Sequence, residues 1–112
     1  MAYDGELADR IRLLAAADGT VVSEKRMFGG LAFLVGGNKA ISASGQGGVL
    51  VRVDPAESDE LVRTTSATVA VMRGREMAGW LRVASADLTE DEQLEPRVRR
   101  GLRYAGSLPP RR

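Results

Sequence analysis

The chain has 112 residues, with 16 Lys or Arg, 15 Asp or Glu and a formal net charge of +1. A chain of this length builds one hydrophobic core, so we expect a single domain over residues 1–112. The sequence contains no Cys and no His, which excludes disulfides, thiolate nucleophiles, the usual zinc ligand sets and imidazole acid–base catalysis.

The predicted location follows from the hydropathy of the chain. The first residues, Met1 to Asp4, lack the basic and apolar regions of a signal peptide, and no apolar run approaches the roughly 20 residues that span a bilayer. We therefore expect a cytoplasmic protein without a membrane partner. Its balanced charge creates no global field toward nucleic acid, so an electrostatic site must be local.

The first half of the chain predicts one helix followed by short strands. Asp4 can cap a helix that ends at Asp18-Gly19, with Leu7, Ile11, Leu14 and Ala15 on one buried face. Extended runs follow at 21–28, 31–36, 39–44 and 48–53, separated by glycine-bearing turns. Because no Lys with Ser or Thr at a helix start accompanies the glycines of 27–39, we interpret them as hairpin turns and not as a phosphate loop.

The second half predicts a helix, two strands and a last helix. Asp54, Pro55 and Glu57 are typical of a helix start, and this helix ends near Arg63. Strands are predicted at 68–73 and 79–83, and a Thr89–Glu92 capping box then precedes a core stripe of Leu94, Val98, Leu102 and Ala105. Proline within a helix costs about 3 kcal/mol or more, so Pro96 predicts either a kink or a restart.

These elements predict an α+β fold with one antiparallel twisted sheet and helices mainly on one face. The expected order is a helix, three or four strands, a helix, two strands and a helix. Strand alternation then indicates what the second face of the sheet carries. With Val49, Val51 and Val53 on one face, the opposite face holds Arg52, and in the same way Trp80 and Arg82 point outward, with Arg26 and Phe28 as candidate neighbours.

A tryptophan among arginines is typical of interface hot spots, so the candidate partner-binding residues are Arg26, Arg52, Trp80 and Arg82. The alternative is that a helix or a terminus covers Trp80 as ordinary core. A second candidate site, for nucleic acid, is the arginine-rich last helix, with Arg97, Arg99, Arg100 and Arg103 as phosphate contacts. The same arginines also suit the negative end of a helix dipole, which leaves both interpretations open.

Nothing in the sequence pairs a nucleophile with a base, so we predict a protein that is not an enzyme and has no cofactor and no metal. The acidic pairs Asp59-Glu60 and Asp91-Glu92 lie at predicted helix starts, where solvation and the helix dipole explain them.

Four stretches of the sequence resemble the TfoX/Sxy amino-terminal domain family. They are residues 25–33 (KRMFGGLAF), residues 51–55 (VRVDP), Arg75 and Met77 with Gly79-Trp80, and residues 104–109 (YAGSLP). The resemblance covers essentially the whole chain, including the opening MAYD, and departs from the family pattern at Pro96-Arg97.

The resemblance implies an α+β fold similar to the secretion-chaperone-like class, in which the motif residues Met27, Phe28, Gly29, Gly30 and Gly79 are structural. It also implies a regulatory role in competence and transcription through a protein partner such as a transcription factor, with no catalytic residues to carry over. Neither the residues nor the resemblance decides between a monomer and a homodimer.

Overall fold

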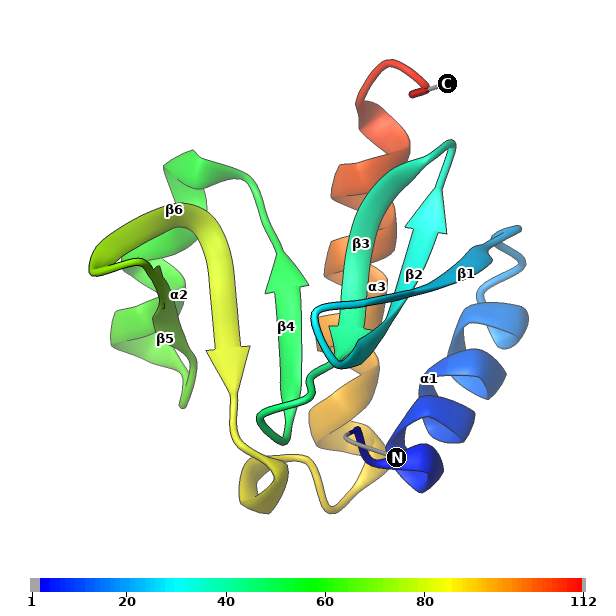
Figure 1. Cartoon of the computed structure of the whole chain (residues 1–112), viewed down its shortest axis with the longest axis horizontal. Helices are drawn as coiled ribbons and strands as arrows, with labels where there is room; N and C mark the ends of the chain where they lie inside the picture. Colours follow the sequence, from blue (N-terminus) through cyan, green and yellow to red (C-terminus); the bar gives the residue numbers. More distant parts are fainter. Residues whose placement is uncertain (1–2, 112) are drawn as a thin grey trace.

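The computed structural model describes residues 3–111, so Met1, Ala2 and Arg112 lie outside the described part. Residues 3–111 form three α-helices, two short 3-10 helices and a six-stranded sheet (Figure 1). The helices are α1 (Gly5–Ala17), α2 (Ser58–Thr64) and α3 (Asp91–Ser107), and 3-10 turns at Pro55–Glu57 and Ser85–Asp87 precede α2 and α3. The strands are β1 (Ser23–Met27), β2 (Gly30–Val35), β3 (Asn38–Ala43), β4 (Val49–Arg52), β5 (Thr68–Met72) and β6 (Arg75–Val83).

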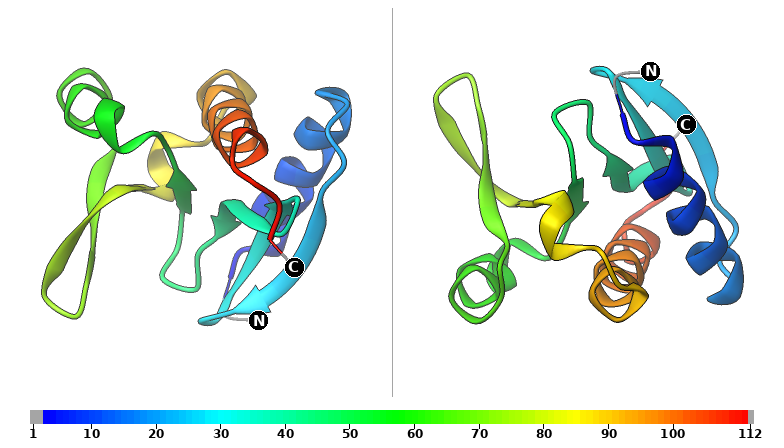
Figure 2. Two further views of the ribbon diagram at one scale, coloured as in Figure 1. Left: turned by 90° about the horizontal axis from the view of Figure 1, so that it is seen from above. Right: turned by 90° about the horizontal axis from the view of Figure 1, so that it is seen from below.

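The sheet has the order β1-β2-β3-β4-β6-β5, and every neighbouring pair is antiparallel. All three helices lie on one side of it, while the ends of the β1–β2 and β5–β6 hairpins curve away on the other side (Figure 2). The predicted α+β class, the antiparallel sheet and the order of elements are therefore confirmed. In the described part of the chain, helices cover one face of the sheet and no helix covers the other, which we call the uncovered face.

Helix α1 begins where the sequence predicts it. The Asp4 side chain accepts hydrogen bonds from the backbone N–H groups of Glu6 and Leu7, which otherwise have no partner in a helix. Its buried face consists of Leu7, Ala8, Ile11 and Ala15, so Ala8 takes the place predicted for Leu14, which is only partly buried. The Asp54 cap before α2 is confirmed in the same way by its hydrogen bond from Ala56 N–H.

The core lies between α3 and the covered face of the sheet. The predicted stripe of Leu94, Val98, Leu102 and Ala105 is buried, and it packs with sheet residues that include Phe33, Ile41, Val51 and Leu81. Gly101 lets α3 approach β3, because a Cβ on Gly101 would lie 2.5 Å from the carbonyl oxygen of Ala40. This close approach fixes which face of the sheet is buried.

The start of α3 differs from the prediction. The helix begins at Asp91, and the Gln93 side chain accepts the hydrogen bond of the Glu90 backbone N–H at 2.9 Å, so the predicted Thr89–Glu92 box is wrong by one residue. Thr89 instead donates its hydroxyl to the same Gln93 oxygen. Pro96 is exposed inside one continuous helix, so the predicted restart at this residue does not occur.

The first hairpin turn lies one residue earlier than predicted, and the β5–β6 turn is one residue shorter than predicted. Phe28-Gly29 and Arg73-Gly74 each form a two-residue connection with positive φ at both positions (53° and 76°, 52° and 77°), as type I′ turns require. Strand β6 therefore begins at Arg75, four residues before the predicted strand. A residue other than glycine in this conformation costs about 1 kcal/mol or more, so the backbone conformations of Phe28 and Arg73 each lower the free energy of unfolding.

Two irregularities shape the uncovered face. In β3 the register with β2 shifts at Ala40, so that Ile41 pairs with Phe33 and Lys39 with Leu34. This bulge turns Lys39 to the face opposite Ile41, whereas regular alternation would put both side chains on one face. In β6 the register with β5 shifts next to Gly79 (φ 86°), where the strand bends (Figure 1).

A pair of alanine substitutions in α3 tests the close approach to β3. Gly101→Ala forces the helix away from Ala40, and overpacking of this kind lowers the free energy of unfolding by about 1–3 kcal/mol. Gly106→Ala is the matched control, because its Cβ meets only Val35 at an ordinary 3.6 Å. Its better helix propensity should raise the free energy of unfolding by up to about 1 kcal/mol. Urea denaturation measures both, and equal effects of the two substitutions would contradict the packing.

Candidate functional site

A row of paired residues crosses the uncovered face of the sheet. The strand register connects Ala32, Ser42, Leu50 and Arg82 side by side on the four central strands, and the row ends at Lys25 on β1 and Thr68 on β5. Ser42 and Leu50 are each only 4% exposed although no helix covers them. Longer side chains from the same face and from the hairpin turns therefore cover this floor.

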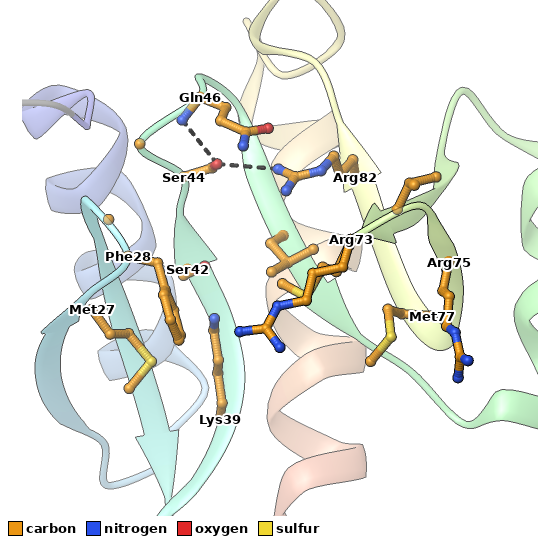
Figure 3. Close-up of a pocket in the computed structure, with 15 residues that line it drawn as sticks. Met27, Phe28, Lys39, Ser42, Ser44, Gln46, Arg73, Arg75, Met77 and Arg82 are labelled. Atoms are coloured by element: carbon orange, nitrogen blue, oxygen red, sulfur yellow. Dashed lines mark hydrogen bonds between the residues drawn. The ribbon is translucent and has the colours of Figure 1, made fainter.

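A cleft of about 840 Å³ lies over this floor (Figure 3). Met27 and Phe28 of the β1–β2 hairpin form one wall, and Arg73, Arg75 and Met77 of the β5–β6 hairpin form the other. A second hollow of about 590 Å³ continues it toward Trp80 and Arg111, and both are lined by Phe28, Lys39 and Leu50. The two hollows form one groove, which we call the sheet cleft.

The sheet cleft is positively charged along its length. Among the described residues that line it, every charged side chain is a Lys or an Arg. The ion pairs of the described chain join other groups, namely Arg10–Asp91, Arg12–Asp9, Arg12–Glu24, Arg99–Glu95 and Arg100–Glu57. The cations of the cleft are therefore not compensated by carboxylates in the way that those of the helical side are. They are Lys25, Lys39, Arg52, Arg73, Arg75, Arg82 and Arg111.

Trp80 is half-buried on the uncovered face, directly opposite Arg52 in the β4–β6 register. The Arg52 guanidinium lies 5.1 Å from the centre of its ring, and the Lys39 ammonium lies 5.4 Å from it. Such cation–π contacts contribute about 0.5–1 kcal/mol each at exposed sites and more when water is excluded. The tryptophan thus holds two of the cations in place and does not belong to the helix-covered core.

Lys39 lies at the junction of the two hollows, also 6.0 Å from the centre of the Phe28 ring. Burial lowers the pKa of its ammonium group, and the positive charge of Arg82 lowers it further. Arg82 is itself positioned by a hydrogen bond of 3.2 Å to the Ser44 hydroxyl, which also accepts the backbone N–H of Gln46 (Figure 3). An anion in the cleft would relieve the repulsion between these two cations.

The two non-glycine residues with positive φ in the described chain, Phe28 and Arg73, both belong to this site. Phe28 is 90% exposed at the rim of the cleft, and the Arg73 side chain extends from the β5–β6 turn over the cleft (Figure 3). Strained backbone held at a binding surface is a common property of functional sites. Neither side chain is part of the core that the helices cover.

The carboxyl-terminal segment closes one end of the cleft. The Arg111 backbone N–H donates to the Gly36 carbonyl at 2.7 Å, and the buried Asn38 side chain donates to the Pro109 carbonyl at 3.0 Å. The Gly36-Gly37 turn therefore holds the end of the chain, which places Arg111 beside the cleft.

The family model of the TfoX N-terminal domain matches residues 12–105 of this chain. The chain belongs to the TfoX N-terminal domain family. The comparison with curated proteins finds no match. The family supports a regulatory type of domain and is not known as an enzyme family.

The structure gives the motif residues of this TfoX N-terminal domain specific places. Gly29 completes the first hairpin turn, Gly30 starts β2, and Met27 and Phe28 line the cleft and not the core. Gly79 donates its backbone N–H to the Ser58 hydroxyl at 2.9 Å and accepts from Val53 N–H at 2.8 Å, which ties the bend of β6 to the start of α2.

The predicted partner-binding residues are only partly brought together. Arg52, Trp80 and Arg82 lie together on the uncovered face. Arg26 does not join them, because it pairs with the core residue Leu31, and its neighbour Glu24 on the same face contacts Arg12 of α1. Lys25 occupies the place expected for Arg26. Lys39, Arg73 and Met77 line the same cleft and were not among the predicted residues.

The arginines of α3 form a different surface. Arg99 and Arg100 pair with Glu95 and Glu57, and Arg97 donates to the Thr65 hydroxyl at 3.3 Å. Burial and the nearby Arg100 lower the pKa of Arg97. Arg103 is exposed. Nucleic-acid binding through these four arginines stays a prediction, with two of their charges already shared with carboxylates.

Two further features bear on the class of site. Across residues 3–111 no cluster of three or more potential metal-binding carboxylates comes together. Within the same residues, none of the helices has the length and apolarity needed to cross a membrane.

An NMR titration tests the charge environment of the TfoX N-terminal domain cleft. Arg82→Gln removes the like charge that faces Lys39, so the pKa of Lys39 should rise toward the ordinary lysine value of about 10.4. The ¹³Cε shift of Lys39 reports this pKa. Arg103→Gln makes the same charge change on α3 and should leave the pKa of Lys39 where it is. An unchanged pKa in Arg82→Gln would contradict the proximity of the two groups.

Proposed function

We propose that this domain is a non-enzymatic regulatory interaction domain that binds a protein partner, such as a transcription factor, through the sheet cleft. The observation that carries the proposal is the grouping of aromatic, methionine and arginine side chains on a face that no helix covers. Aromatic residues, Met and Arg are the types that are enriched at protein interfaces. The cleft residues of these types are Met27, Phe28, Arg52, Met72, Arg73, Arg75, Met77, Trp80, Arg82 and Arg111.

The exposed hydrophobic side chains support the same surface. Phe28, Val71 and Met72 are 90%, 55% and 38% exposed, and all three line the cleft. Hydrophobic groups that gather on one exposed patch and are surrounded by polar residues are typical of interaction sites. Leu13 and Val21, which are also exposed, do not line it.

The proposal is tested by site-specific photo-crosslinking in the source cells. With p-benzoylphenylalanine in place of Phe28, irradiation should attach a protein to the domain, and the adduct should survive nuclease. The same photo-reactive residue in place of Leu13, which is 71% exposed on α1, is the matched control. It should give no such adduct, since α1 lies on the other side of the sheet (Figure 2).

Two results would overturn the proposal. One is an adduct at Phe28 that nuclease removes, because this would identify nucleic acid as the occupant. The other is the same set of adducts from both positions, because the cleft would then be no preferred surface.

A further inference from the structure

We propose that the sheet cleft recognises an extended acidic segment of its protein partner, one whose apolar side chains alternate with carboxylates. This inference rests on the proposed function and deepens it by giving the chemistry of the bound segment. Three properties of the cleft support it: its charge, its apolar walls and its aromatic contacts.

Charge complementarity requires an acidic occupant. The cleft gathers lysines and arginines from β1, β3, β4, β6, the β5–β6 turn and the end of the chain, and no Asp or Glu among the described residues lines it. Lys39 and Arg82 repel each other there, and burial already disfavours the charge of Lys39. Carboxylates from a partner would satisfy these groups with charge-assisted hydrogen bonds.

The walls of the cleft require apolar groups in the same ligand. Met27, Met72 and Met77 line these walls together with the exposed Val71, whereas Leu50 of the floor is already covered by longer side chains. Methionine side chains are flexible and polarisable, so they adapt to apolar side chains of different shape. A ligand with carboxylates alone would leave this apolar lining in contact with water.

The aromatic side chains favour a peptide over single-stranded nucleic acid. Bases bind to such surfaces by stacking on free aromatic rings. The ring of Trp80 is occupied by Arg52 at 5.1 Å and by Lys39 at 5.4 Å, and the Lys39 ammonium also lies 6.0 Å from the centre of the Phe28 ring. Phe28 is 90% exposed and can contact an apolar side chain, but a single exposed ring does not make a stacking platform.

The size of the cleft indicates an extended segment. Its two hollows of about 840 and 590 Å³ are continuous through Phe28, Lys39 and Leu50. The cations are distributed from Arg82 at one end to Arg111 at the other, which suits several charges in sequence better than one small anion. An extended peptide of about nine residues spans roughly 30 Å, comparable to the domain itself at 31 × 30 × 27 Å.

The test uses the full chain and a set of labelled peptides of about nine residues, the length that spans the domain. The probe peptide alternates Glu with Leu. One companion has Gln in place of each Glu, and a second has Ser in place of each Leu. A labelled oligothymidylate of similar length represents single-stranded nucleic acid. Fluorescence anisotropy measures binding, and the fluorescence of Trp80, the one tryptophan of the chain, reports occupancy of the cleft.

The expected result is that the Glu–Leu peptide binds more tightly than both companions and than the oligothymidylate, with an affinity that falls as salt is raised. The double substitution Arg52→Gln with Arg82→Gln should weaken this binding by about tenfold, as the loss of two charge contacts does. Arg99→Gln with Arg103→Gln removes the same charge from α3 and should change the affinity less than about twofold, because these residues lie outside the cleft.

Equal binding of the Gln companion, tighter binding of the oligothymidylate, or an equal loss in the α3 variant would overturn the inference. Circular dichroism identifies a cleft variant that fails to fold. In that case the pKa of Lys39 in the native chain decides, since it should rise when the Glu–Leu peptide binds and stay unchanged if the carboxylates bind elsewhere.

The two proposals fail in different ways. A nuclease-resistant protein adduct at Phe28 whose attached segment lacks acidic residues would overturn the acidic-segment inference and keep the proposed function. The opposite result is also possible: the Glu–Leu peptide binds in the cleft, but only nucleic acid is crosslinked at Phe28 in cells. This result would overturn the proposed function, while the preference of the cleft for alternating carboxylates and apolar groups would stand.

Discussion

The contact between α3 and β3 is the constraint on which the rest of this structure depends. Gly101 has no side chain, so the helix backbone lies close to the Ala40 carbonyl, and the stripe from Leu94 to Ala105 closes over the centre of the sheet. Helices α1 and α2 pack on the same side. Because most apolar residues of the chain are buried on that side, the other face of the sheet carries cations and a few exposed hydrophobic groups. A domain that buries one face of its sheet in this way has a surface available for a partner.

Irregular backbone, and not regular strand geometry, then shapes this surface. The bulge at Ala40 turns Lys39 away from the core, and the bend at Gly79 gives β6 the curvature that carries the β5–β6 hairpin over the cleft. Phe28 and Arg73 adopt positive φ in two-residue turns and line the opposite walls. Each of these features has a cost for folding, and together they surround one groove. This coincidence is the physical reason to regard the groove as functional.

Much of the fold could be predicted from the sequence, because it depends on local rules. Neighbouring residues alone predict the helix caps at Asp4 and Asp54 and the buried stripe of α3. They also predict the alternation of buried and outward side chains around Val51 and Leu81. The alternation of side chains along each strand correctly predicts that Arg52, Trp80 and Arg82 share one face. Arg26 was misplaced because the prediction had no register for β1, and a shift of one residue exchanges the faces of a strand. Lys39 could not be found, since the bulge that redirects it is a property of the pairing between β2 and β3, which the alternation within a single strand does not show.

The most direct test of this account is collisional quenching of Trp80, the one tryptophan of the chain. If the uncovered face carries uncompensated cations, iodide should quench its fluorescence more strongly than caesium, because the field of Lys39 and Arg52 attracts the anion and repels the cation. The difference should shrink as an inert salt is added, since exposed charges are screened. Equal quenching by the two ions, or stronger quenching by caesium, would contradict the central claim that this face is an open cationic surface.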